Sequence, residues 1–128
     1  MSKVNLIDLF KSHRLLTVLP YTLYVIEFYD LIFKDSFCKI GITEYNTQMR
    51  FNREEYNNLI IKNEYVVKGP KDLIRKQENE NIHLFRRYRK TPRRRFSGRT
   101  ECFKPDAYIE IEKKLKNDQL LILEHFNV

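Results

Sequence analysis

The sequence has no tryptophan, only two cysteines and three glycines, and no long apolar run. Cys38 and Cys102 are too few for a disulfide framework or a four-ligand zinc site, so we expect both to be buried, reduced thiols in an intracellular protein. No apolar run approaches the roughly 20 residues of a membrane-spanning helix, and the N-terminus lacks the pattern of a secretory signal peptide. We therefore expect a soluble protein of the cytoplasm or nucleus, with no membrane partner.

The chain has 128 residues and a formal net charge of +7. This length fits one domain with a single core, and the apolar and aromatic content argues against disorder along the whole chain. The charge indicates a polyanionic partner, either nucleic acid or an acidic membrane surface, although many basic proteins bind neither. The clustering of the basic residues favours nucleic acid.

Two runs rich in β-branched and aromatic residues, 21–28 and 37–43, are typical of strands. With Asp35 and Ser36 near the turn, they predict a β-hairpin. Residues 64–68 form a third predicted strand, which Gly69 and Pro70 stop.

Helical spacing of apolar residues predicts helices around these strands, at 2–16, 48–61, 72–87 and 105–116. A last apolar stretch, 120–126, has no clear periodicity. The simplest packing is an α+β fold with a small three-stranded antiparallel sheet flanked by helices. We place the core domain at 21–116, between an N-terminal helical extension at 1–20 and a C-terminal extension at 117–128.

A tyrosine, a lysine and an arginine occur in an order that suits phosphodiester chemistry. Hydrolysis needs a base, positive charge near the phosphorus and stabilisation of the leaving oxygen. Tyr24 lies on the first predicted strand, Lys39 on the second, and Arg50 near the start of the next helix, where Arg53 competes for its role. Taken singly, Tyr24 is more typical of an ordinary strand aromatic and Lys39 of a surface lysine, and an exposed helical arginine is the alternative for Arg50. Tyr24 acts as a base only if its pKa, ordinarily near 10, is lowered.

Gly41 follows Lys39 by two residues and removes a side chain where a backbone or ligand must come close, unless it marks a bulge.

Eight basic residues and no acidic one lie between positions 86 and 99. Such a run neutralises phosphates with little sequence preference, and Tyr88 and Phe96 offer rings for stacking. The alternative is a solvated loop, which self-repulsion disfavours. The nucleic-acid-binding candidates are Arg86, Arg87, Arg89, Lys90, Arg93, Arg94, Arg95 and Arg99.

These segments together resemble the GIY-YIG endonuclease superfamily, in particular its T5orf172-type subgroup of phage and viral proteins. The two strand motifs are similar to residues 22–24 and 39–43, the helical motif to Glu78 and the residues up to Arg89, and a later signature to residues 98–103. The resemblance covers about residues 21–110. Thr22 replaces the glycine of the first motif, Cys102 replaces a tryptophan, and Arg50 lies one residue late.

The resemblance implies a DNA endonuclease in which Tyr24 helps to activate water while Lys39 and Arg50 stabilise the phosphorane. It also implies a single Mg²⁺ or Mn²⁺ ion held by a glutamate, Glu78 in the first place and Glu101 in the second. In a purely structural interpretation, Glu78 lies on a solvated helix edge and Glu101 caps a helix.

The partner implied is DNA, and sequence preference would come from the domain's own surface or from a homodimer. Two other functions stay open. One is a catalytically inactive nucleic-acid-binding module, which the missing glycine suggests; the other is a protein-interaction or inhibitor domain that docks through residues 120–126. Fold alone does not decide between them.

Overall fold

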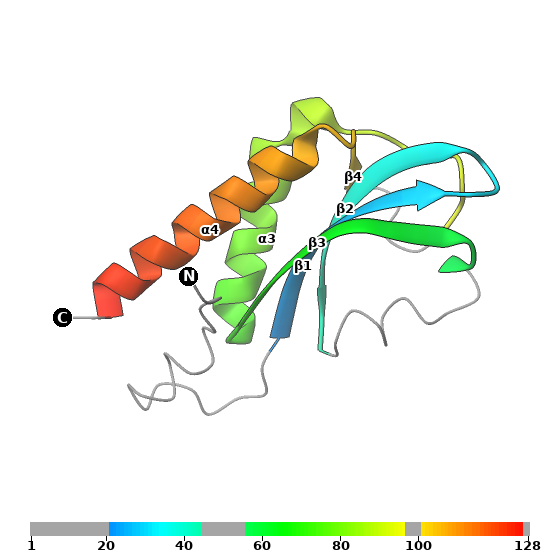
Figure 1. Cartoon of the computed structure of the whole chain (residues 1–128). Coiled ribbons are helices and arrows are strands. Elements are labelled where there is room, and N and C mark those ends of the chain that lie inside the picture. Colours follow the sequence, from blue (N-terminus) through cyan, green and yellow to red (C-terminus); the bar gives the residue numbers. More distant parts are fainter. Residues whose placement is uncertain (1–20, 45–55, 97–100, 127–128) are drawn as a thin grey trace.

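The computed structural model describes residues 21–44, 56–96 and 101–126, the last six of these by their backbone only. A four-stranded antiparallel sheet and two long helices make up this part (Figure 1). In chain order the elements are β1 (Tyr21–Asp30), β2 (Asp35–Thr43), β3 (Leu59–Gly69), α3 (Lys71–Leu84), the 3-10 turn η2 (Arg86–Tyr88), β4 (Cys102–Phe103) and α4 (Ala107–Phe126). The strands lie in the order β3-β1-β2-β4.

The predicted hairpin is the centre of the sheet. β1 and β2 pair over their whole length, from Thr22 opposite Thr43 to Asp30 opposite Asp35. β1 is also paired with β3 on its other side. The register is regular at Thr22, so the threonine in place of the motif's glycine introduces no bulge there.

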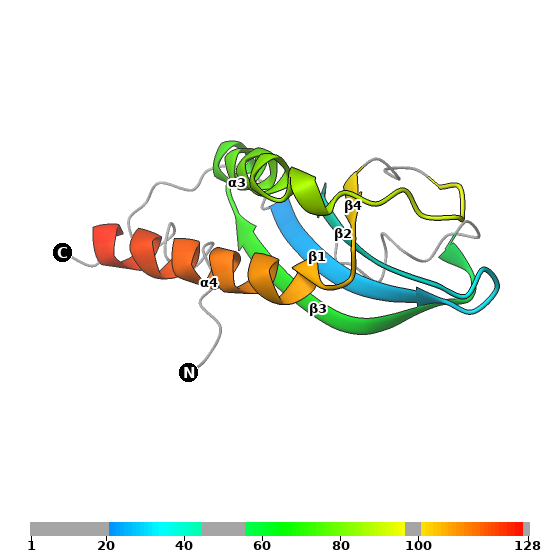
Figure 2. The same ribbon diagram turned by 90° about the horizontal axis from the view of Figure 1, so that it is seen from above.

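Both helices cover one face of the sheet (Figure 2). Alternate residues of β1, such as Leu23 and Val25, point to this face and join a core with Ile74 of α3 and Ile111 of α4. All four are fully buried. Burial of these apolar side chains supplies the driving force that holds the layers together.

The other face of the sheet carries a second cluster, which includes Tyr24, Ile26, Phe28, Phe37 and Cys102. These side chains alternate along the strands with those of the first core, as the two-residue repeat of a strand requires. The face is therefore apolar at one end of the hairpin. Toward the other end it presents Tyr24 and, beside it, a lysine.

The α+β class is as predicted, but the sheet has four strands rather than three. The fourth, β4, has two residues and lies against the edge of β2. Two residues carry no readable strand pattern, so only the pairing with β2 defines this element.

Several element boundaries differ from the prediction. α3 ends at Leu84, short of the predicted end at residue 87, and Arg86–Tyr88 form the 3-10 turn η2 instead. Leu59 to Ile61 fall within a predicted helix but begin β3, opposite Phe28 to Asp30 of β1. Their apolar side chains fit the period of a helix as well as that of a strand. Asn58, just before them, has a positive φ of 66° and so lies in neither a helix nor a strand.

At the other end, the helix expected to stop at Lys116 continues as α4 to Phe126, so residues 117–126 prolong it rather than forming a separate element. The predicted N-terminal helix, and residues 48–55 of the predicted second helix, lie outside the described residues. None of the helices in the described ranges is long and apolar enough to cross a membrane.

Candidate active site

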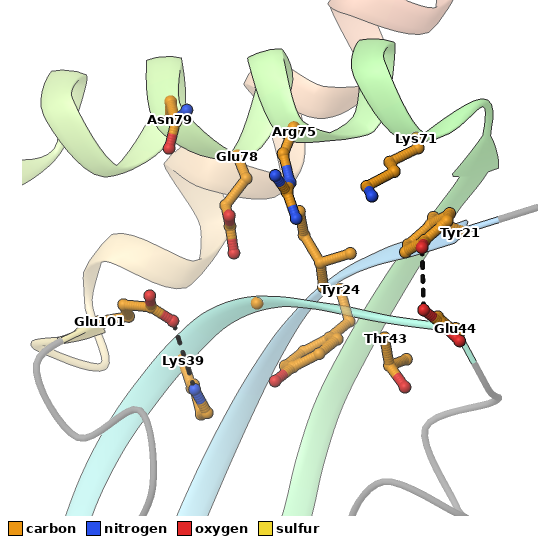
Figure 3. Close-up of a pocket in the computed structure, with 12 residues that line it drawn as sticks. Tyr21, Tyr24, Lys39, Thr43, Glu44, Lys71, Arg75, Glu78, Asn79 and Glu101 are labelled. Atoms are coloured by element: carbon orange, nitrogen blue, oxygen red, sulfur yellow. Dashed lines mark hydrogen bonds and ion pairs between the residues drawn. The ribbon is translucent and has the colours of Figure 1, made fainter.

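A pocket of about 670 Å³ is lined by side chains of α3, of the strands β1 and β2, and of Glu101 just before β4. Figure 3 shows Glu78 and Arg75 pointing from α3 toward the strands, with Glu101 and Lys39 at one end and Lys71 and Tyr21 at the other. The lining residues are Tyr21, Tyr24, Lys39, Gly41, Ile42, Thr43, Glu44, Lys71, Arg75, Glu78, Asn79 and Glu101.

The strand register brings Tyr24 and Lys39 together. Tyr24 pairs with Gly41, and the next pair on the same face is Ile26 with Lys39. The Nζ atom of Lys39 lies 5.9 Å from the centre of the Tyr24 ring. Each residue is only 1% exposed, so the ammonium group is held within the fold instead of reaching into bulk water.

Gly41 makes the position of Tyr24 possible. A Cβ atom at position 41 would lie 2.5 Å from Cζ of Tyr24 and would overlap its hydroxyl oxygen. The phenol therefore crosses directly over the glycine. Of the two interpretations of Gly41, close approach applies and a bulge does not, because the pairing of β1 with β2 is unbroken.

β4 brings Glu101 to the same place. Lys39 pairs with Cys102, so the residue just before β4 lies beside the lysine. Oε2 of Glu101 is 3.7 Å from Nζ of Lys39, and the side chain of Glu101 is 38% exposed. The lysine is thus buried while its acidic neighbour remains open to the pocket. Cys102, which replaces the motif's tryptophan, is itself fully buried in the second cluster.

Glu78 reaches the pocket from the third turn of α3. Burial in the first place, and the negative charge of Glu101 in the second, raise the pKa of this carboxyl to about 7, against the opposing charges of Lys39 and Arg75. Two carboxylates that share one partly buried pocket repel each other. A cation placed between them would relieve that repulsion.

The donor set fits a magnesium ion better than a zinc ion. Among the residues that the structure describes, no group of three or more His, Cys, Asp or Glu side chains is able to hold a metal. Mg²⁺ needs less, since it keeps several waters and is bound through one or two carboxylates together with substrate phosphates. Three carboxylates line this pocket; Glu78 and Glu101 lie toward Lys39, whereas Glu44 lies near Tyr21 and accepts its hydrogen bond (Figure 3).

Four predicted site residues therefore line one pocket: Tyr24, Lys39, Glu78 and Glu101. Arg50 and its competitor Arg53 lie outside the described residues.

Sequence reasoning overlooked Tyr21, Lys71 and Arg75, which line the same pocket. The signal for the two cations was present, because positions 71, 75 and 78 recur at helical spacing and so share one face of α3.

The basic run is not uniformly open to solvent, because two of the predicted nucleic-acid-binding residues, Lys90 and Arg94, are held in ion pairs within the fold. Arg94 forms two hydrogen bonds with the buried Asp30, at 2.7 and 2.9 Å. Lys90 pairs with Asp35 at 2.6 Å, and the backbone N–H of Arg93 donates to the same carboxylate. These aspartates flank the β1–β2 turn, so the run is attached to the hairpin.

The other basic side chains of the run that the structure describes are exposed. Of the predicted nucleic-acid contacts, Lys90 and Arg94 are half-buried in ion pairs and Arg99 lies outside the described residues. The exposed ones are Arg86, Arg87, Arg89, Arg93 and Arg95.

The fold and pocket define a small α+β protein with a mixed-charge cavity lined by α3 and the two inner strands of its sheet. Comparisons with protein-family models, with curated proteins and with solved structures find no match for this chain. The GIY-YIG resemblance therefore rests on the residues themselves.

Proposed function

We propose that this chain is a Mg²⁺-dependent endonuclease that hydrolyses phosphodiester bonds of DNA by a GIY-YIG-type single-metal mechanism. The observation that carries the proposal is convergence. A phenol, a buried lysine and two carboxylates, predicted from separate parts of the sequence, line one pocket. Such convergence of titratable groups in a concave site is what an active site requires.

Each residue has a role that its surroundings support. Lys39 is held 3.7 Å from Glu101 and next to the Tyr24 ring, so its charge is fixed in place before a phosphate arrives. Preorganised positive charge of this kind stabilises the developing charge of a pentacovalent phosphorus. Tyr24 is the residue whose hydroxyl accepts or relays the proton of the attacking water.

Glu78 and Glu101 are the residues that would hold the ion. A bound Mg²⁺ supplies Lewis-acid stabilisation of the phosphate oxygens and of the leaving 3′ oxygen. We rank Glu78 first because it lies on the helix that follows the third strand, the position that the resemblance implies for the metal ligand. Burial and the charge of Glu101 raise its pKa to about 7, and a bound cation would oppose that rise. Arg50 or Arg53 is proposed as the second cation on the phosphate.

DNA is proposed as the polymer because the exposed arginines of the basic run, such as Arg86 and Arg95, give a polyanion a sequence-independent surface. Recognition of particular sites would then come from this surface or from a homodimer. A compact domain that binds DNA through phosphate contacts is expected to nick it with weak sequence preference.

The proposal is tested by incubating supercoiled plasmid with the protein and Mg²⁺ and following the nicked form. We expect nicking that EDTA abolishes and Mn²⁺ restores. Glu78→Gln, Tyr24→Phe and Lys39→Met should each reduce the rate by at least ~100-fold, within the range that general acid–base and electrostatic contributions span.

Glu80→Gln is the matched control. Glu80 lies on the same helix, is exposed and does not line the pocket, so its variant should nick like the wild type. The nuclease proposal would be refuted if the wild type does not nick the plasmid, or if Glu78→Gln and Glu80→Gln nick it at equal rates. Salt-sensitive DNA binding without cleavage would instead identify the inactive binding module.

A further inference from the structure

The pocket has a second half that the hydrolytic residues do not use. Tyr21, Lys71 and Arg75 line it at the end away from Lys39 and Glu101 (Figure 3). β1 begins with Tyr21 and α3 begins with Lys71, so the first residues of two elements meet here. Glu78 lies between this end and the end occupied by Glu101.

Arg75 has no carboxylate partner among the residues that the structure describes, although it shares the pocket with Glu78. Several other basic side chains are paired, such as Arg94 with Asp30 and Lys114 with Asp118. The guanidinium nonetheless acts on both neighbours, since its charge opposes the rise in the pKa of Glu78 and of Tyr21. Arg75 therefore lies close to both groups and leaves its donors for a ligand.

Tyr21 is fixed as a flat platform beside these cations. Its hydroxyl donates a hydrogen bond of 2.8 Å to Glu44, and Nζ of Lys71 lies 5.7 Å from the centre of its ring. A half-buried ring anchored at its hydroxyl is suited to stack on a base or a sugar. The guanidinium of Arg75 offers a phosphate two parallel donors, and Lys71 adds a second positive charge.

From this arrangement we infer that Tyr21, Lys71 and Arg75 form a binding subsite for the nucleotide next to the scissile phosphate, with the two cations on its phosphate and the Tyr21 ring against its base. The inference rests on the proposed function for the identity of the polymer. The chemistry that it requires of the ligand is a phosphate joined to an aromatic ring. Lys39, Glu78 and Glu101 then serve the adjacent phosphate.

The test uses a small ligand and no metal, so that it is independent of cleavage. Thymidine 3′,5′-bisphosphate is titrated into the full chain by calorimetry in EDTA at low salt. Arg75→Ala and Lys71→Ala should each weaken binding at least fivefold, and Arg75→Lys should weaken it less than Arg75→Ala. Lys76→Ala is the matched control because Lys76 is exposed on the same helix but does not line the pocket; it should change binding less than twofold.

A second comparison tests the platform. Deoxyribose 3′,5′-bisphosphate, which lacks the base, should bind the wild type more weakly than the thymidine compound does. Tyr21→Leu should abolish this difference, whereas Tyr21→Phe, which loses only the bond to Glu44, should retain it.

The inference is overturned if the wild type does not bind the nucleotide, if Arg75→Ala binds like the wild type, or if Lys76→Ala weakens binding as much as Arg75→Ala. The last result would mean that positive charge on α3 attracts the nucleotide without a specific binding site. The two proposals can fail separately. If the nucleotide binds in a way that depends on Arg75 but the plasmid is not nicked, the subsite proposal stands and the nuclease proposal fails. Nicking that is indifferent to Arg75, Lys71 and Tyr21 does the reverse.

Discussion

At the scale of single residues, the site depends on one steric relation and one electrostatic relation. The steric relation is the crossing of the Tyr24 ring over Gly41. The electrostatic relation is the sharing of one partly buried pocket by Glu78 and Glu101. Each makes a prediction that is independent of the identity of the substrate.

Gly41→Ala should destabilise the fold and displace the tyrosine. The added methyl group would overlap the Tyr24 hydroxyl, and Tyr24 is too buried to move aside freely. Overpacking of this kind costs about 1–3 kcal/mol, measurable by denaturant unfolding. In a Tyr24→Leu background the same glycine substitution should cost much less, because the ring is gone. Equal costs in the two backgrounds would show that the clash is not the cause.

Glu78→Gln should change how stability depends on pH. The folded-state pKa of about 7 lies above the ordinary value of 4.5, so the unfolded chain releases this proton first. Stability is then fully present below pH ~4.5 and is lost as the pH rises through 7, by roughly 1–2 kcal/mol once solvent screening of this partly exposed carboxyl is allowed for. The glutamine variant lacks this loss, so it should gain stability over the wild type between pH 5 and 8 in urea titrations.

The control for this pH dependence is Glu80→Gln, whose carboxyl is exposed and which should follow the wild type at both pH values. Mg²⁺ at pH 8 should raise the melting temperature of the wild type more than that of Glu78→Gln, since an ion that binds only the folded state stabilises it. A stability difference between wild type and Glu78→Gln that is the same at pH 5 and pH 8 would contradict the assigned pKa.

At the scale of elements, the β1–β2 hairpin is held by the segment that follows η2. The carboxylate of Asp30 accepts hydrogen bonds from the backbone N–H groups of Ile32 and Phe33 and two more from Arg94. The turn and residues 90–94 thus form one hydrogen-bonded unit. It positions the exposed arginines of the basic run relative to the sheet.

Asp30→Asn should loosen this unit and reduce stability at neutral pH by about 3–5 kcal/mol, the usual effect of breaking a buried ion pair. The hydrogen bonds from Arg94 hold the pKa of Asp30 below its ordinary value of 3.8. The stabilisation is therefore present above pH ~4 and is lost as the pH falls through the lowered folded-state pKa. Acid and urea unfolding measure both effects.

Asp118→Asn is the matched control at this scale. Its carboxylate pairs with Lys114 one turn away on α4, and both side chains are partly exposed, so the change should cost only about 0.3–0.5 kcal/mol. Similar costs for the two asparagine variants would show that the Asp30–Arg94 pair does not hold the hairpin.

At the scale of the whole molecule, the net charge of +7 is divided between structural and solvent-facing groups. Arg86, Arg87 and Arg95 are exposed, whereas Lys90 and Arg94 are engaged with the hairpin aspartates. Only the exposed kind is placed to release counterions from a nucleic acid. The net charge of the sequence therefore overstates the positive charge that this surface presents to solvent.

Replacing Arg86, Arg87 and Arg95 by glutamine should weaken DNA binding and flatten its salt dependence, by about 0.9 in log–log slope for each phosphate that is no longer neutralised. Lys90→Gln should lower the unfolding free energy while changing the salt slope much less. Fluorescence anisotropy with duplex DNA at salt concentrations from about 50 to 200 mM makes the comparison. Equal slopes for the triple variant and the wild type would show that DNA does not bind through these three arginines.

The sequence alone determined the local parts of this protein. Runs rich in β-branched and aromatic residues predicted the β1–β2 hairpin, and residue types and order singled out Tyr24 and Lys39, because the period of a strand can be read from neighbouring positions. Glu78 and Glu101 were singled out by the resemblance to the GIY-YIG motifs. The two-residue β4, the start of β3 at Leu59 and the extension of α4 carried no such local signal.

Only the tertiary structure decided which distant groups meet. The pairing of Lys39 with Cys102 puts Glu101 beside the lysine, and the packing of α3 on the sheet turns Arg75 into the same pocket. The capture of Arg94 by Asp30 is likewise a contact across 64 positions. Such contacts depend on how faces pack and on which buried charges find partners, and that information belongs to the folded chain as a whole.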